Sequence, residues 1–210
     1  MHEAAPQHWK LIQAVAAEAG VSVDVPVYPL VQAGGTAETV VPIVAELAQR
    51  ASRPVVLMGD SAGGTIAMST SLLLQEQGDP ADLTVLISPV LDLRMTNPEI
   101  DALQPLDPWL VKNGQRLLTE MWIGEHSDNP VLNPIFGDVS GAGRLVIFSG
   151  TRDILHPDIR LFVRGAEKSG NEVVYHESPG QLHVYPLLPT PEARAARKSI
   201  VQAVRGAIQT

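Results

Sequence analysis

The residues 59–64, Gly-Asp-Ser-Ala-Gly-Gly, form the part of the sequence with the most specific chemical pattern. They contain Gly-x-Ser-x-Gly, with a continuous apolar strand pattern before it (54–58) and a helical pattern after it (62–77). A sharp strand-to-helix turn of this kind exposes the serine hydroxyl as a nucleophile. The pattern therefore predicts that Ser61 is the nucleophile of a hydrolytic site.

The neighbours of Ser61 are expected to support this chemistry. Positions 59 and 63 are expected to require glycine, because a Cβ on Gly59 or Gly63 would strike the neighbouring strand or helix. Gly64 belongs to the same turn. The backbone N–H of Ala62, at the start of the helix, is predicted to donate to a developing oxyanion. A phosphate cradle is disfavoured because no lysine follows in the turn and Asp60 would repel an anion.

A serine hydroxyl needs a base to take its proton and an acid to hold that base. In α/β-hydrolases these partners follow in the order serine, acid, histidine. Asp153 fits the acid because it lies in the loop that leaves the buried strand pattern 145–149. Asp158 follows a proline and is more typical of the first turn of the next helix, whereas Asp92 would serve only in a rearranged site.

His183 is the predicted base, because it lies in the loop 180–185 between the last strand and the terminal helix. The other histidines precede the serine, lie within other expected elements or are too close to Asp153 in the sequence; they are His2, His8, His126, His156 and His176.

Short β-rich runs alternate with helical patterns, which predicts a mostly parallel sheet with helices on both faces. The expected helices are 8–19, a segment from Thr36, 62–77 and a terminal segment from 190–191; the expected strands are 21–28, 54–58, 83–88, 145–149 and 172–176. The segment 92–136 breaks the alternation, with five prolines, two of the three tryptophans and weak helical periodicity at 111–122. We expect it to be a lid inserted into a single domain spanning 1–210.

The composition excludes several other classes of protein. The formal net charge of −8, without a basic stretch, argues against nucleic-acid binding. The absence of cysteine excludes disulfides and thiolate metal sites, and it fits a cytoplasmic location. No signal peptide is visible, and the apolar runs are far shorter than the ~20 residues of a membrane-spanning helix.

The three motifs together resemble the bacterial hormone-sensitive-lipase family of α/β-hydrolases. Gly-Asp-Ser-Ala-Gly-Gly, Gly-Thr-Arg-Asp-Ile-Leu (150–155) and His-Val-Tyr (183–185) occur in that family's order and spacing, and 25–30, Val-Pro-Val-Tyr-Pro-Leu, resembles the segment after its fourth strand. The resemblance implies a triad of Ser61, Asp153 and His183, an oxyanion donor at Ala62, short- to medium-chain acyl esters as substrates, and neither cofactor nor metal. Terminal strands mediate some dimers in such folds, so a homodimer is an option that no residue here decides.

The sequence departs from this family at its N-terminal end. The family's His-Gly-Gly-Gly motif, whose backbone N–H groups complete the oxyanion hole, does not occur in the 210 residues. We therefore expect an N-terminally incomplete hydrolase, lacking the first three strands. The first hypothesis is an esterase that acts through an acyl-enzyme on Ser61; an amidase or peptidase using the same triad is an alternative of the same class. The second hypothesis is a weak or inactive hydrolase that binds a hydrophobic ligand.

Overall fold

The computed structural model describes residues 4–126 and 128–209. Its centre is a four-stranded parallel sheet in the order β1-β2-β3-β4, formed by Val56–Asp60, Leu83–Ile87, Arg144–Gly150 and Val173–Ser178. The register places Asp60 beside Ile87, Ile87 beside Phe148 and Phe148 beside His176. The carboxyl ends of all four strands therefore lie at one edge of the sheet.

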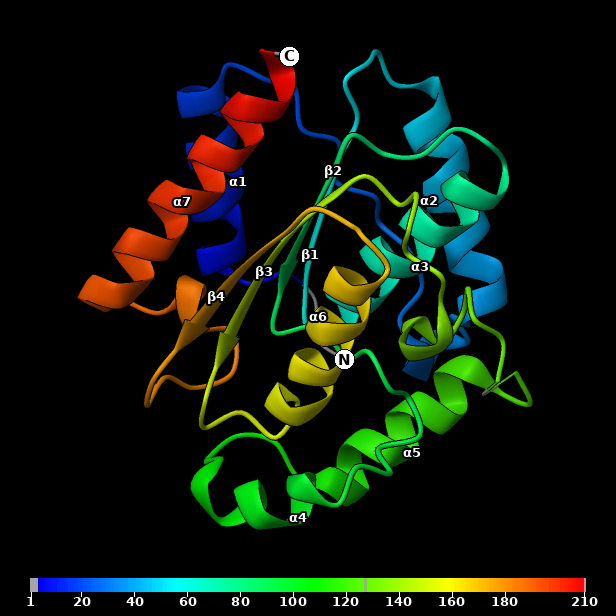
Figure 1. Cartoon of the computed structure of the whole chain (residues 1–210), viewed down its shortest axis with the longest axis vertical. Coiled ribbons are helices and arrows are strands. Elements are labelled where there is room, and N and C mark those ends of the chain that lie inside the picture. Colours follow the sequence, from blue (N-terminus) through cyan, green and yellow to red (C-terminus); the bar gives the residue numbers. More distant parts are fainter. Residues whose placement is uncertain (1–3, 127, 210) are drawn as a thin grey trace.

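Helices cover both faces of the sheet (Figure 1). On one face pack α1 (Pro6–Ala19) and α7 (Pro191–Ile208), and on the other α2 (Ala37–Arg50), α3 (Ala62–Glu76) and α6 (His156–Lys168). This arrangement confirms the predicted α/β architecture and most of the predicted elements. None of the helices in the described ranges is long and apolar enough to cross a membrane.

The apolar runs of the strands reflect burial on both faces. In β3, Val146 and Phe148 join the core beneath α1 and α7, whereas Leu145 and Ile147 join the core beneath α2, α3 and α6. All four side chains are at most 1% exposed. Since a strand alternates its side chains between faces, a sheet covered on both sides requires a continuous apolar sequence rather than an alternating one.

The predicted strand at 21–28 is wrong. Residues 21–30 have no regular secondary structure, and within the described ranges they pair with no strand, so β1 is an edge of the sheet. Alternating valines gave the segment a strand pattern, but Val27 is 98% exposed. Pro26 lies inside the run and removes a ladder donor, and a strand exists only where a neighbouring strand accepts and donates its hydrogen bonds.

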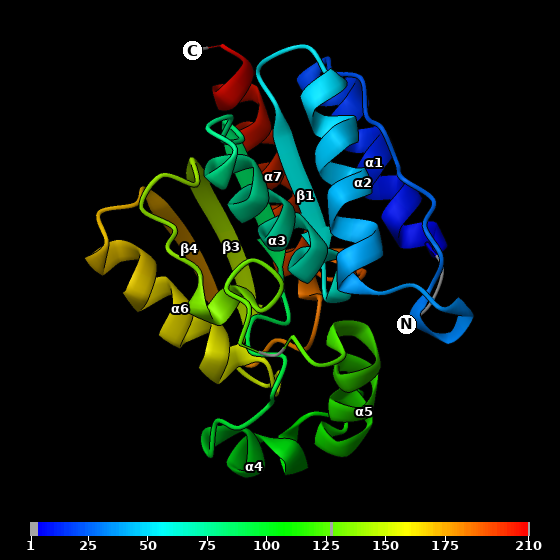
Figure 2. The same cartoon turned by 90° about the vertical axis from the view of Figure 1, so that its right-hand side faces the viewer.

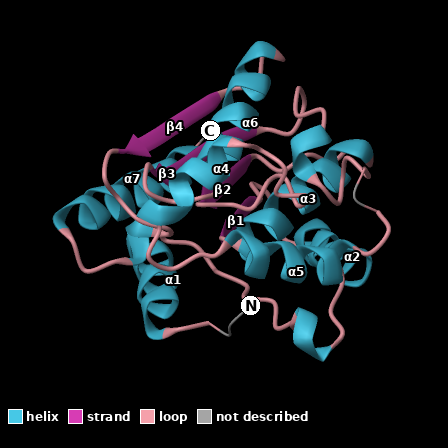
Figure 3. Ribbon diagram, turned by 90° about the horizontal axis from the view of Figure 1, so that it is seen from below, coloured by secondary structure: helices cyan, strands magenta, loops and turns pink. Residues whose placement is uncertain are grey.

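The segment 92–136 connects β2 to β3 and contains two helices, α4 (Glu99–Leu103) and α5 (Lys112–Ile123), with short 3₁₀ turns at Gln104–Leu106 and Pro134–Phe136. In Figures 1 and 2 these helices lie below the carboxyl ends of the strands. Figure 3, viewed from that end, shows helices and loops in front of the strands. The segment therefore lies at the edge of the sheet that carries the predicted catalytic residues.

Candidate active site

Ser61 occupies the turn between β1 and α3. Its backbone has φ 52° and ψ −120°, a conformation that costs free energy in a residue other than glycine. The turn is held because the Ser61 N–H donates to the carbonyl of Ile87 (2.9 Å) on the neighbouring strand, and the Ser61 carbonyl accepts from the N–H of Thr65 (3.2 Å). The strained backbone is thus held by hydrogen bonds to the neighbouring strand β2 and to the first turn of α3.

The glycines of this turn have different roles. A Cβ on Gly59 would lie 2.1 Å from the carbonyl oxygen of Gly63, so position 59 admits only glycine. A Cβ on Gly64 would lie 2.8 Å from the Cβ of Pro89, which makes this position tight as well. The steric reason predicted for Gly63 is wrong, because a Cβ there meets nothing within 4 Å. Gly63 is already in the helix and faces open space.

Ala62 is the first residue of α3. The first N–H groups of a helix have no carbonyl partner within it, and the helix dipole favours negative charge at this end. The structure therefore leaves the Ala62 N–H next to Ser61 in a position suited to the predicted oxyanion interaction.

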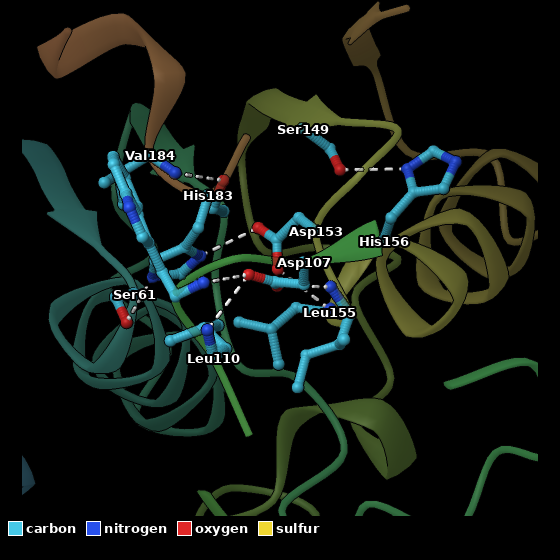
Figure 4. Close-up of polar contacts among 12 residues, drawn as sticks. Ser61, Asp107, Leu110, Ser149, Asp153, Leu155, His156, His183 and Val184 are labelled. Atoms are coloured by element: carbon cyan, nitrogen blue, oxygen red, sulfur yellow. Dashed lines mark hydrogen bonds and ion pairs between the residues drawn. The ribbon is translucent and has the colours of Figure 1, made fainter. Parts of the chain in front are cut away.

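Asp153, His183 and Ser61 come together in one hydrogen-bonded line (Figure 4). His183 Nε2 lies 3.0 Å from Ser61 Oγ, and His183 Nδ1 lies 2.8 Å from Asp153 Oδ2. With the proton on Nδ1, the ring donates to the carboxylate and accepts from the serine hydroxyl. The residues are 122 and 30 positions apart in sequence, and the strand ends of a parallel sheet bring them together.

The loops that carry Asp153 and His183 hold each other in place. Gly150 ends β3, and a Cβ there would lie 2.3 Å from the carbonyl oxygen of Gln181. This close approach allows the Arg152 N–H to donate to the same carbonyl (3.0 Å). On the far side of His183, the N–H of Val184 donates to Ser88 Oγ (3.0 Å), beyond the end of β2. The loop that carries His183 is therefore held from the ends of two strands, β3 and β2.

Two opposing effects set the protonation of His183. The side chain is only 8% exposed, and burial disfavours the charged ring. The carboxylate of Asp153 favours the charged ring by charge and by hydrogen bonding, with Asp107 and Asp60 adding to it, and the net result is a pKa of His183 raised from 6.5. Asp153 itself is fully buried, and its Oδ1 accepts the N–H of Leu155 (2.9 Å).

The competing residues have other partners. Asp92 binds the guanidinium of Arg94. Asp158 lies in the first turn of α6 and accepts a hydrogen bond from the side chain of Asn97. The other described histidines have partners other than Ser61: His8 contacts Asp60, His126 contacts Glu38, His156 contacts Ser149 and His176 stacks on Phe148. His2 lies outside the described residues.

One contact beside Ser61 was not predicted from the sequence. His8 Nε2, in the first turn of α1, lies 3.3 Å from Asp60 Oδ2, and the Ala5 N–H donates to His8 Nδ1 (2.8 Å). The hydrogen bond to Asp60 outweighs partial burial and raises the pKa of His8. A contact across 52 residues has no local pattern that could have predicted it.

Comparison with known proteins identifies the family of this fold. Residues 1–187 match the family described as the alpha/beta hydrolase fold. The chain is 31% identical over 188 residues to a triacylglycerol lipase of Mycobacterium tuberculosis, covering 86% of this chain and 38% of that protein. It is 31% identical over 141 residues to an acetyl-hydrolase of Streptomyces hygroscopicus, covering 64% of this chain and 47% of that one.

The fold is also shared with solved structures. A hormone-sensitive lipase from a metagenome library superimposes with a TM-score of 0.80 at 24% identity, covering 94% of this chain and 71% of that one. The chain spans less than half the length of the two curated relatives described above. The match across 1–187 confirms, at the level of the family, the resemblance found in the three motifs: the chain belongs to the alpha/beta hydrolase fold family.

Proposed function

We propose that this chain is a serine hydrolase that cleaves carboxylic esters, with Ser61 as nucleophile, His183 as base and Asp153 as the acid that orients the base. The observation that carries the proposal is the unbroken line from Asp153 Oδ2 to His183 (2.8 Å) and from His183 to Ser61 Oγ (3.0 Å). A serine that is strained, at a helix N-terminus and hydrogen-bonded to a histidine has the geometry that nucleophilic acyl transfer needs.

The reaction follows from these positions. Ser61 Oγ attacks the ester carbonyl carbon while its proton passes to His183 Nε2, and the oxyanion accepts a hydrogen bond from the Ala62 N–H. The imidazolium gives that proton to the leaving alcohol, which leaves an acyl group on Ser61. Water then attacks the acyl carbon with His183 as base, and the carboxylic acid and free Ser61 are released. Asp153 stabilises the imidazolium in both halves of the reaction.

The segment 92–136 is the proposed lid, and apolar side chains near its middle support that role. Leu106, Trp109 and Val111 are 48%, 50% and 61% exposed, and they flank Asp107, whose carboxylate contacts the Asp153 loop. We propose that they bind the acyl or alcohol group of short- to medium-chain esters. The similarity to proteins named as a triacylglycerol lipase and an acetyl-hydrolase supports an ester substrate.

Hydrolysis of p-nitrophenyl esters tests this proposal. We expect release of p-nitrophenol from the butyrate ester, with slower turnover of the palmitate ester. Ser61→Ala lowers kcat by about 10⁴-fold or more, because the nucleophile is lost. Ser199→Ala, at a half-buried position of α7 whose hydroxyl contacts the carbonyl of Ala195 in the same helix, is the matched control and keeps the wild-type rate. Equal activity of Ser61→Ala and the wild type contradicts the proposal.

A second candidate function is binding of a hydrophobic ligand without turnover. It is favoured by one observation. In the bacterial hormone-sensitive-lipase family, which the motifs resemble, a His-Gly-Gly-Gly motif supplies further oxyanion donors, and this motif does not occur in these 210 residues. Loss of one oxyanion donor costs about 10²–10³ in kcat. Saturable binding of the butyrate ester to the wild type, with no p-nitrophenol released, would favour this alternative.

A further inference from the structure

The carboxylate of Asp107 joins the segment 92–136 to the loop that carries Asp153. Its Oδ1 accepts the backbone N–H groups of Trp109 (2.8 Å) and Leu110 (2.9 Å). Its Oδ2 accepts the N–H of Ile154 (3.0 Å), the residue that follows Asp153. Asp107 is 8% exposed, and Figure 4 shows it directly beside Asp153 and His183. One buried carboxylate therefore serves two separate parts of the chain.

The Ile154 contact is one half of a clamp. The other half is formed by Arg152, whose Nε donates to the carbonyl of Leu106 (3.2 Å). Two consecutive residues of the segment, 106 and 107, thus hold the two residues that flank Asp153. Asp153 in turn uses its Oδ1 to accept the Leu155 N–H (2.9 Å), which leaves Oδ2 for His183. The rotation of the Asp153 carboxylate therefore depends on a backbone that the clamp fixes.

The charge of Asp107 also acts on the base. Burial opposes a charged His183, and Asp153 is the main group favouring it, but Asp107 contributes in the same direction to a raised pKa of His183. The clamp on the Asp153 loop and the negative charge of Asp107 reinforce each other, because the imidazolium formed during the reaction needs both an aligned Asp153 and nearby negative charge.

We propose that Asp107 is a positioning residue for the reaction: it holds the Asp153 loop in register with His183 and couples the segment 92–136 to the acid of the site. This inference rests on the proposed function. A turn-capping role alone would account for the contacts to Trp109 and Leu110, which are two and three residues away. It does not account for the contact to Ile154, which is 47 residues away and adjacent to Asp153.

Asp107→Asn separates the two roles. An amide has one acceptor oxygen, so it can cap the 109–110 turn or accept from Ile154, but its NH₂ group then faces N–H donors on the other side. The matched control is Asp101→Asn, a carboxylate in α4 of the same segment that is exposed and paired with Lys112. Thermal unfolding of each variant shows whether the fold is kept.

Steady-state kinetics with p-nitrophenyl butyrate give the first readout. We expect Asp107→Asn to lower kcat by about 10- to 100-fold, with KM within about threefold of wild type, because a displaced Asp153 impairs the chemical step rather than binding. Asp101→Asn keeps both constants. Where loss of the buried carboxylate prevents folding, Arg152→Ala tests the exposed half of the clamp, and kcat falls several-fold without a change in KM.

NMR titration of the His183 ring gives a readout that does not depend on turnover. We expect the pKa of His183 to fall in Asp107→Asn and to stay at its wild-type value in Asp101→Asn, because Asp107 is among the charges that raise this pKa and Asp101 is not. If the wild-type chain hydrolyses no ester, the proposed function fails, while the titration still tests the influence of Asp107 on His183. Folded Asp107→Asn and Arg152→Ala variants with wild-type kcat and an unchanged His183 titration would overturn the inference.

Discussion

Burial and negative charge act against each other on His183, and in the proposed reaction their balance decides the pH at which this ring can accept the Ser61 proton. Burial disfavours the imidazolium, whereas Asp153, Asp107 and Asp60 favour it and prevail. Neutral His183 is the form that accepts a proton from Ser61. The proposed reaction therefore needs a pH above the raised pKa of His183, because the neutral ring is lost as the pH falls.

The dependence of kcat/KM on pH checks this prediction. We expect the acid limb to follow one ionisation with a midpoint above 6.5, the ordinary value for histidine, since the pKa of His183 is raised. Thermal unfolding measured across the same pH range is the control that excludes acid unfolding as the cause. An acid limb centred below 6.5 in folded protein would contradict a raised pKa of His183.

Among the elements, the turn between β1 and α3 determines whether the Ser61 backbone can adopt its strained conformation. The turn is tight at Gly59, where a Cβ would overlap the carbonyl of Gly63, and open at Gly63 itself. Both glycines belong to the same sequence motif, yet only the first is sterically required. The pattern Gly-x-Ser-x-Gly thus combines a packing constraint with a position for which sterics give no reason.

Alanine substitution of the two glycines should separate these roles. Gly59→Ala is expected to destabilise the fold by about 3 kcal/mol or more, because the turn must open to admit the methyl group. Gly63→Ala is expected to change stability by no more than about 1 kcal/mol, since the methyl group meets open space on a helix. Urea unfolding compares the variants directly; similar losses in both would show that the turn is not arranged as described.

The helices and strands also show which parts of the fold can be predicted from the sequence and which cannot. Strands β1, β3 and β4, whose ends lead to Ser61, Asp153 and His183, were predicted within two residues. In β3 the reason is that a strand buried on both faces has a continuous apolar sequence. The edge strand β4 is only partly buried and ends in His-Glu-Ser, so its valines and tyrosine gave the pattern instead. The pattern at 21–28 failed because strand formation depends on a neighbour, which periodicity does not reveal. The short helix α4 left no clear pattern, since five residues contain too few turns to show a period.

At the scale of the whole molecule, the site is assembled by topology. Parallel strands end at one edge, so residues far apart in the sequence meet there once the order of strands is fixed. Order and spacing were enough to predict that Ser61, Asp153 and His183 would lie together. The contacts from Asp107 to Ile154 and from His8 to Asp60 could not be predicted, because they depend on how the segment 92–136 and α1 pack on that edge.

That packing also buries a carboxyl group, Asp158, at the base of the segment. Its Oδ1 accepts from Asn97 Nδ2 (2.8 Å), and its Oδ2 is buried with no hydrogen-bond partner among residues 4–126 and 128–209. Burial raises the pKa of Asp158 from 3.8 to about 6; the charge of Asp92 acts in the same direction, and the Asn97 hydrogen bond opposes it. The folded state therefore holds its proton more tightly than the unfolded chain.

This difference predicts a pH-dependent loss of stability. Below pH 3.8 both states are protonated and there is no penalty; between pH 3.8 and about 6 only the unfolded chain ionises, and the penalty grows to a plateau. The plateau is on the order of 2–3 kcal/mol. We expect Asp158→Asn to match the wild type near pH 4 and to be more stable by that amount at pH 8, as measured by urea unfolding. A stability difference that does not vary with pH would contradict this prediction.

Labelling with a fluorophosphonate probe tests whether His183 makes Ser61 nucleophilic. The probe forms a covalent bond with an activated serine, and peptide mass spectrometry locates it without a natural substrate. We predict a single adduct on Ser61 in the folded chain, no adduct in Ser61→Ala, and labelling slowed at least about 10³-fold in His183→Ala, where the base is lost. A folded wild-type chain that remains unlabelled, or that is labelled at Ser61 equally fast without His183, would contradict the account.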